Sequence, residues 1–202
     1  MNDLKFKYKI GVSGAEQIDH CSEGAAEKAR EVGRQIAKHD AALFTGACWG
    51  MPYEAVLGTK EAEGFSVGVS PAMSEKDHYE QFKMPKDNFD LIFYTGYGFS
   101  ARNVWLMRMT DAVIFICGRM GTLNEFTICF EDDRLIGVLE GTGGSTDMIR
   151  EIVQRVNKGP GRIVYESDPE KLVKKLCLEI DKEKKEMKTY FEVQKHLKGR
   201  KL

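Results

Sequence analysis

A turn around Gly118 holds the residues best suited to binding a phosphate group. The apolar run Ala112–Cys117, rich in β-branched residues, ends at this glycine. Gly121 and Thr122 follow closely, and Leu123–Phe130 then reads as a helix. A buried strand that leads through a glycine-containing turn into a helix N-terminus is a backbone arrangement suited to phosphate. The sequence therefore predicts a nucleotide site at this turn.

A carboxylate lies beside the turn, at Glu125, one helical turn beyond the glycines. A phosphate site next to a carboxylate makes Glu125 a candidate catalytic residue. Two structural alternatives are open. Glu125 could be an acid in the first turn of a helix, where the helix dipole stabilises it by about 0.3–1 kcal/mol. It could also form a salt bridge with Arg102 that only joins two helices.

Strands and helices alternate along the chain, which predicts an α/β fold. We expect a single domain over residues 1–202, a Rossmann-like, doubly wound parallel sheet with helices on both faces. The predicted strands are Tyr8–Ser13, Ala41–Thr45, Phe65–Ser70, Phe89–Tyr94, Ala112–Cys117, Leu135–Leu139 and Arg162–Tyr165. The predicted helices are Gly24–His39, a helix that follows the loop Gly46–Gly50 and runs to about Glu63, Ser100–Thr110, Leu123–Phe130, Thr146–Asn157 and Pro169–Glu183.

Two segments depart from this alternation. Pro71–Asn88 is polar and irregular, and we expect it to be a mobile flap. Residues 182–202 are rich in Lys and Glu, which predicts a charged helical tail in solvent.

Glycine-containing turns follow five of the predicted strands. Each one alone is more simply a sharp turn into a helix. However, ligands of this fold class bind outside the carboxyl ends of the strands, and five such turns on one edge favour a ligand site. The candidate phosphate- and nucleotide-binding residues are Ser13, Gly14, Gly46, Gly50, Gly96, Gly98, Gly118, Arg119, Gly121 and Thr122. The GxGxxG fingerprint is absent after the first strand, which argues against an ordinary NAD dehydrogenase.

The charge balance argues against one class of partner. The chain has 30 basic and 31 acidic residues and a net charge of −1, so we expect no nucleic-acid partner. The N-terminal residues Met1–Gly11 lack an apolar core, and no apolar run approaches the length of a membrane span. We therefore expect a cytoplasmic protein without a membrane partner.

The five cysteines are odd in number and include no C-x-x-C pair, which fits a reducing compartment better than a disulfide framework. Cys48 and Cys117 lie near the predicted site, and we interpret both as small buried hydrophobic residues. We predict no cofactor and no metal site, because the four histidines show no metal-ligand spacing. They are His20, His39, His78 and His196.

The segment Gly118–Glu125 (GRMGTLNE) resembles the P-G-G-x-G-T-x-x-E motif of the Lonely Guy (LOG) family. Members were long described as lysine decarboxylases and are now understood as nucleoside 5′-monophosphate phosphoribohydrolases. Arg102 stands 23 positions before the motif glutamate, as the family arginine does, and Thr110–Ala112 and Thr45–Met51 match further family features. The similarity runs over residues 9–139. It is closer still to an uncharacterised branch of this Rossmann superfamily, which also contains molybdenum-cofactor carrier proteins.

The resemblance implies hydrolysis of an N-glycosidic bond through a ribosyl cation. Glu125 would stabilise this cation or orient water and the ribose hydroxyls. Arg102 would anchor the phosphate or favour departure of the base. The glycine turn at Gly118 would hold the 5′-phosphate of a small-molecule nucleotide. Three aromatic residues are candidates either to stack on the base or to pack in the core: Trp49, Tyr97 and Phe99.

The chain departs from the LOG motif at three positions. Cys117 stands where the family has proline, Arg119 where it has the second glycine, and Asn103 where it has lysine. Arg119 either keeps a phosphate away from the backbone or pairs with it through its guanidinium. Two functions are open: a phosphoribohydrolase, and a non-catalytic protein that binds or carries a nucleotide or the pterin of the molybdenum cofactor.

The resemblance also implies a homo-oligomer, a dimer or larger, formed through helices beside the site. The helix Ser100–Thr110 carries Val104, Trp105, Met107 and Met109. These are too many large apolar groups for one buried stripe, so some are candidates to meet a partner subunit. The alternative is that the helix is buried within its own monomer.

Overall fold

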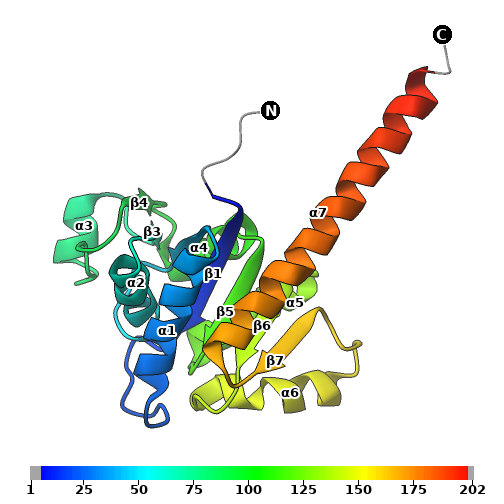
Figure 1. Ribbon diagram of the computed structural model, residues 1–202. Helices are drawn as coiled ribbons and strands as arrows, with labels where there is room; N and C mark the ends of the chain where they lie inside the picture. The colour runs from blue at the N-terminus through cyan, green and yellow to red at the C-terminus, as the bar shows by residue number, and fades with distance from the viewer. Residues whose placement is uncertain (1–5, 200–202) are drawn as a thin grey trace.

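The computed structural model describes residues 6–199, with side chains up to residue 190 (Figure 1). Within these residues, seven parallel strands form one sheet in the order β4-β3-β2-β1-β5-β6-β7. The strands are β1 (Tyr8–Gly14), β2 (Ala41–Thr45), β3 (Phe65–Ser70), β4 (Leu91–Tyr94), β5 (Ala112–Ile116), β6 (Leu135–Leu139) and β7 (Ile163–Glu166). The predicted α/β class is confirmed.

Helices cover both faces of the sheet. The helices are α1 (Ala25–Lys38), α2 (Met51–Glu61), α3 (Glu75–Glu80), α4 (Gly98–Met109), α5 (Met120–Glu131), α6 (Gly144–Val156) and α7 (Pro169–Gly199). One core packs α1, α2 and α7 against one face of the sheet, and a second core packs α4, α5 and α6 against the other. The chain is therefore doubly wound, as the alternation of strands and helices predicts.

The position of β5 inside the sheet, between β1 and β6, explains why its sequence is apolar throughout. Its five residues are all buried, because helices cover both faces and strands flank both edges. The chain begins at its neighbour β1 and adds β2, β3 and β4 in turn, until β4 forms one edge of the sheet. From there α4 returns the chain to β5, beside β1, with Gly14 opposite Ile116. The strand order reverses at this pair, which makes the carboxyl ends of β1 and β5 the topological switch point.

The segment Pro71–Asn88 is more regular than its polar sequence predicts. It contains the short helix α3, whose N-cap Ser74 accepts a hydrogen bond from the backbone N–H of Asp77. His78 on this helix is buried, with its ring nitrogens 2.9 Å from Ser70 Oγ and 2.8 Å from the carbonyl oxygen of Pro85. A buried polar ring thus anchors α3 to the end of β3, the rest of the segment is irregular as predicted, and its mobility stays a prediction.

Helix α7 begins at Pro169, as the sequence predicts. It continues without a break from the predicted helix into the predicted tail, and Figure 1 shows it projecting beyond the rest of the fold. Its first part packs on the sheet, through residues such as Leu172 and Leu176. Residues 200–202 of the predicted tail, and both ends of the predicted domain, lie outside the described residues. None of the helices in residues 6–199 combines the length and apolar character that crossing a membrane requires.

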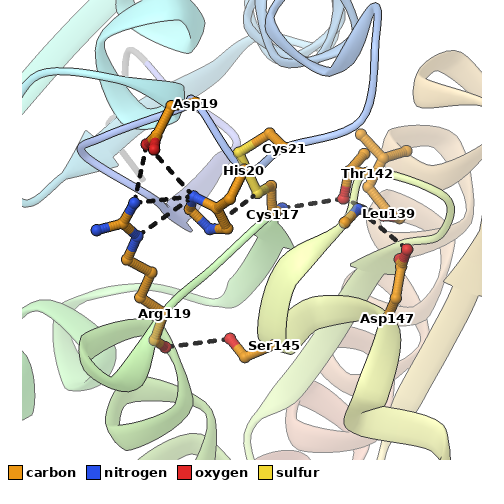
Figure 2. Close-up of a disulfide and its surroundings, with 10 residues drawn as sticks. Asp19, His20, Cys21, Cys117, Arg119, Leu139, Thr142, Ser145 and Asp147 are labelled. Atoms are coloured by element: carbon orange, nitrogen blue, oxygen red, sulfur yellow. Dashed lines mark hydrogen bonds and ion pairs between the residues drawn. A yellow bond between two sulfur atoms is a disulfide. The ribbon is translucent and has the colours of Figure 1, made fainter.

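Two of the cysteines form a disulfide, Cys21–Cys117 (Figure 2). The expectation that the cysteines are free is therefore wrong for this pair, and Cys117 is not simply a small hydrophobic residue. The two residues are 96 positions apart, but the loop after β1 lies against the end of β5, so their Cα atoms are only 5.7 Å apart. The other three cysteines are free: Cys48, Cys129 and Cys177.

Candidate functional site

A cavity of about 330 Å³ opens at the switch point. Five parts of the fold contribute to it: the end of β1 with its loop, the loop after β2, and the starts of α2, α4 and α5. The residues that line it are Val12, Ser13, Gly14, Ala15, Glu16, Gln17, Gly46, Cys48, Pro52, Phe99, Arg102, Asn103, Arg119, Gly121, Thr122 and Glu125. The structure thus brings eight of the twelve predicted site residues together around one cavity.

The carboxylate of Glu125 lies inside this cavity, with 8% of the residue exposed. Ser13 Oγ, at the end of β1, donates a hydrogen bond to Glu125 Oε2. Burial raises the pKa of Glu125, because a low-dielectric environment disfavours the charged form. The positive charge of Arg102 and the hydrogen bond from Ser13 oppose this shift of the pKa without cancelling it.

Arg102 is a buried cation on α4, only 5% exposed. Its Nη1 donates hydrogen bonds to the carbonyl oxygen of Gly46 and, at 3.0 Å, to that of Val69. A Cβ on residue 46 would lie 2.0 Å from Nη1, which explains a glycine at this position. Among the described residues, Arg102 is held by these carbonyl oxygens and Glu125 by Ser13, no ion pair joins the two side chains, and the Nε of Arg102 has no hydrogen-bond partner. The salt-bridge alternative is therefore wrong.

The helix α5 starts inside the cavity. It begins at Met120, three residues earlier than the sequence predicts, so Gly121 and Thr122 belong to its first turn. Leu123 N–H donates to the carbonyl oxygen of Arg119, and no side chain caps this helix start. The preceding backbone N–H groups of the first turn have no partner within the helix. Around Gly121 there is open space, since no atom lies within 4 Å of a Cβ placed there.

The side chain of Arg119 turns toward the loop after β1 (Figure 2). Its guanidinium donates to Gln17 Oε1 at 2.7 Å, to Asp19 Oδ1 at 2.8 Å and to His20 Nδ1 at 3.2 Å. Arg119 therefore lies at the rim of the cavity and is already paired with an acidic side chain.

Four predicted site residues lie outside the cavity lining. Gly118 packs against Thr122, where a Cβ would lie 2.4 Å from the threonine Cβ. Gly50 precedes α2 with a positive φ of 73°, and its backbone packs against the loop after β1. Gly96 and Gly98, also with positive φ, form the turn from β4 into α4. The geometry of these four glycines fits the simpler interpretation, in which a glycine allows a sharp turn or close packing and contacts no ligand.

Sequence reasoning missed several residues of the lining. Glu16 and Gln17 follow β1 directly, so the rule that ligands bind after the strands would have found them. Asn103 also lines the cavity, with its Nδ2 donating to Asn124 Oδ1 at 3.0 Å. Burial raises the pKa of the Cys48 thiol to about 12, so the thiol is neutral at pH 7 and is not an activated nucleophile.

A family model described as the SLOG cluster4 family matches residues 7–173. The chain belongs to this family. It is 30% identical over 132 residues to an uncharacterized protein of Archaeoglobus fulgidus, a match that covers 65% of this chain and 80% of that protein.

Two solved structures are similar over most of their length. The molybdenum cofactor binding protein from the phototrophic bacterium Rippkaea orientalis aligns with a TM-score of 0.66 and 26% identity, over 88% of this chain and 96% of that one. The Moco carrier protein from Chlamydomonas reinhardtii aligns with a TM-score of 0.69 and 25% identity, over 86% and 99%. The resemblance to the LOG-like superfamily and its branch with molybdenum-cofactor carriers is confirmed.

The raised pKa of Glu125 predicts how stability depends on pH. The folded chain holds this proton more tightly than the unfolded chain, in which the pKa is about 4.3. The resulting stabilisation is present below that pKa and is lost as the pH rises through the folded-state pKa. We expect Glu125→Gln, which cannot ionise, to be more stable than the wild type at pH 7, with a smaller advantage at pH 4. Urea unfolding at both pH values measures this difference.

Glu131 on the same helix is the matched control, since it is exposed and pairs with Lys158 at the surface. Glu131→Gln should change stability by less than about 0.5 kcal/mol at either pH. A Glu125→Gln variant less stable than the wild type at pH 7 would contradict the assignment.

Proposed function

We propose that this member of the SLOG cluster4 family binds a small-molecule nucleotide, a nucleoside 5′-monophosphate, in the cavity at the switch point. One observation carries the proposal. Arg102, a buried cation without a carboxylate partner among the described residues, lines the same cavity as the uncapped first turn of α5. Both features favour an anionic ligand, and leaving a buried charge unneutralised is costly unless something compensates it.

The phosphate of the ligand would bind at the start of α5. The free backbone N–H groups of its first turn and the positive end of the helix dipole favour an anion there. Gly121 leaves room for a phosphate oxygen to approach the backbone, and the Thr122 side chain lies beside it in the lining. Arg102 would supply the balancing positive charge.

The base of the ligand would lie toward Phe99, the one predicted aromatic residue that lines the cavity. Its ring is half exposed and lies 5.8 Å from the Arg102 guanidinium. An exposed aromatic face stacks on a planar base at little cost in conformational entropy. Trp49 and Tyr97 do not line the cavity, so we assign them no part in binding.

The first candidate activity is hydrolysis of the N-glycosidic bond to free base and ribose 5-phosphate. The bond between base and ribose breaks with charge development toward a ribosyl cation, and water adds to the anomeric carbon. Glu125, held by Ser13, is the anion that would stabilise the cation or orient the water. Arg102 would anchor the phosphate or favour departure of the base.

The second candidate is a non-catalytic protein that binds or carries a nucleotide or the molybdenum cofactor. The similarity to the Rippkaea orientalis and Chlamydomonas reinhardtii proteins favours it. The three departures from the LOG motif favour it too, since Arg119 is bound to the loop after β1. The molybdenum cofactor is a pterin with a phosphate group, so the same cavity would serve both ligands.

We expect a nucleoside 5′-monophosphate to bind at least about 10-fold more tightly than the matching nucleoside, because the phosphate supplies the contacts at α5 and Arg102. Calorimetry with AMP and adenosine measures the ratio. Arg102→Ala should abolish the preference, whereas Arg108→Ala, on the same helix but paired with Asp132 at the surface, should keep it. Equal affinity of the wild type for both ligands would contradict a phosphate site.

Arg119→Gly distinguishes the two roles left open for this side chain. Weaker AMP binding would mean that the guanidinium contacts the ligand directly. Tighter binding would mean that the side chain keeps the phosphate away from the backbone.

Turnover separates the two candidate activities. If Glu125 stabilises a ribosyl cation, Glu125→Gln should slow release of base by about 10²–10³-fold, while affinity changes much less. Release of free base and ribose 5-phosphate from a panel of nucleoside monophosphates is the assay, with Glu131→Gln as the control on the same helix. Binding without release by the wild type would establish the carrier. Release that survives Glu125→Gln would exclude this catalytic role.

A homodimer through α4 is also part of the proposal. Met107 is fully buried in the monomer, but Trp105 is 50% exposed. Leu91 and Phe93 on the edge strand β4 are exposed as well. An apolar surface of this kind is typical of an interface between subunits.

We expect light scattering to give a dimer at micromolar concentration, and Trp105→Glu to shift it to a monomer. Met148→Glu, at an exposed apolar residue of α6, should leave the dimer intact. A wild-type monomer would rule out this interface.

A cytoplasmic location and the absence of a nucleic-acid partner remain predictions. The net charge of −1 supports the second, because nonspecific binding to nucleic acid depends on an excess of basic residues. The first is compatible with the Cys21–Cys117 disulfide only if this bond is reduced there, since cytosolic thiols are kept reduced in most organisms.

A further inference from the structure

Three side chains that bind soft metal ions gather where the loop after β1 meets the end of β5 (Figure 2). None of them lines the cavity. They are His20, Cys21 and Cys117, and their ligand atoms all lie within 4.8 Å of one another. The sequence gives no metal-ligand spacing here, because Cys117 comes from the end of β5, far along the chain from the other two. The cluster is formed by the fold.

The distances suit a tetrahedral metal site. His20 Nε2 lies 3.6 Å from Cys117 Sγ. In a tetrahedral zinc site, with Zn–S and Zn–N distances of about 2.3 and 2.0–2.1 Å, the edge between sulfur and nitrogen is also about 3.6 Å. The Cα atoms of Cys21 and Cys117 are 5.7 Å apart, so rotation about the side-chain bonds can separate the two sulfurs once the disulfide is reduced.

Cys117 is held firmly in place for such a role. Its backbone N–H donates to Thr142 Oγ1 at 2.9 Å, and its carbonyl oxygen accepts from Ala15 N–H at 2.6 Å. Its φ of +25° lies in the left-handed region, which a residue with a Cβ rarely adopts. Such a conformation persists only where the surrounding structure imposes it.

We infer that Cys21 Sγ, Cys117 Sγ and His20 Nε2 bind a Zn²⁺ ion when the disulfide is reduced. Two thiolates and one imidazole leave a fourth position open for water. His20 is exposed and Cys21 is half-buried, so an ion can reach the site from solvent. Disulfide and metal are then two alternative states of the same pair of cysteines.

The conversion takes two balanced steps. A dithiol reductant gives two electrons and two protons to the Cys21–Cys117 disulfide, which becomes two thiols while the reductant becomes a disulfide. Zn²⁺ then replaces the two thiol protons, and both are released to solvent. The bound ion and its two thiolates are together neutral.

The neighbours of His20 must adjust when the metal binds. Arg119 Nε now donates to His20 Nδ1, at 3.2 Å, so the proton of a neutral ring lies on Nε2. Metal binding at Nε2 moves that proton to Nδ1, which then needs an acceptor. Asp19 Oδ1, 3.8 Å from Nδ1, is the carboxylate in place to accept it, and this carboxylate–histidine–metal arrangement is common in zinc sites.

Titration of the full chain with Co²⁺ and Zn²⁺ tests the site. Co²⁺ bound to thiolates gives intense charge-transfer absorption in the near ultraviolet, and Zn²⁺ displaces it. We expect one equivalent of Co²⁺ to bind the chain after reduction with a phosphine and none to bind the oxidised chain. We also expect Zn²⁺ to release two protons for each ion bound. This comparison of two states of the wild type needs no variant, so a folding defect cannot obscure it.

Variants assign the ligands. Cys21→Ser and Cys117→Ser should each weaken Zn²⁺ binding by about 100-fold or more, and His20→Ala should weaken it by at least about 10-fold. Cys129→Ala, at a free and buried cysteine, is the matched control and should keep the wild-type affinity. Absence of thiolate–cobalt absorption in the reduced wild type overturns the inference, and so does Cys21→Ser or Cys117→Ser binding as tightly as the control.

Discussion

The pairing of β1 with β5 is the constraint on which the rest of the structure depends. These strands are far apart in the chain but adjacent in the sheet, with Gly14 opposite Ile116. Because both are parallel, their carboxyl ends and the segments that follow lie together. Ser13 can therefore reach Glu125, 112 positions away. The approach is tight, since a Cβ on Gly14 would lie 2.4 Å from the carbonyl oxygen of Ile116.

The same cavity holds two buried charged residues that do not pair. Arg102 is held by backbone carbonyls from the ends of β2 and β3, and Glu125 by the hydroxyl of Ser13. Pairing the two charges directly would offset part of the cost of burying each. Holding each with neutral groups instead leaves their charges directed at a ligand, and fixed groups of this kind need no reorganisation when a ligand binds or reacts.

The sequence predicts the sheet well, and β5 and β6 most clearly, because all five residues of each are buried and none is polar. The sequence does not distinguish the glycine turns that line the cavity from those that do not. Gly14 ends β1, and Gly46 and Gly121 follow β2 and β5, so all three lie at the cavity, whereas Gly96 and Gly98 follow the edge strand β4. Strand order explains why Gly96 and Gly98 lie elsewhere, whereas Gly50 and Gly118 lie outside the lining because their backbones pack against the loop after β1 and against Thr122. The local pattern of glycines along the chain predicts neither effect.

The disulfide and the cluster around it could not be predicted for a similar reason. Counting cysteines and measuring their spacing along the chain gives no information about Cys21 and Cys117, which meet only after β1 pairs with β5. The polar lining residues Glu16 and Gln17 carry no distinctive motif. Their position after β1 was the only signal.

Two of the departures from the LOG motif have one structural explanation. Cys117 and Arg119 both contact the segment from Gln17 to Cys21, the first through the disulfide and the second through its guanidinium. In the LOG motif, proline and glycine at these two positions shape the backbone turn. In this chain, Cys117 and Arg119 instead attach the loop after β1 to the turn. Since Arg119 is already paired with Asp19, a phosphate can recruit it only by breaking that ion pair. The backbone of α5 and the buried Arg102 are therefore the groups that can hold an anion without rearrangement.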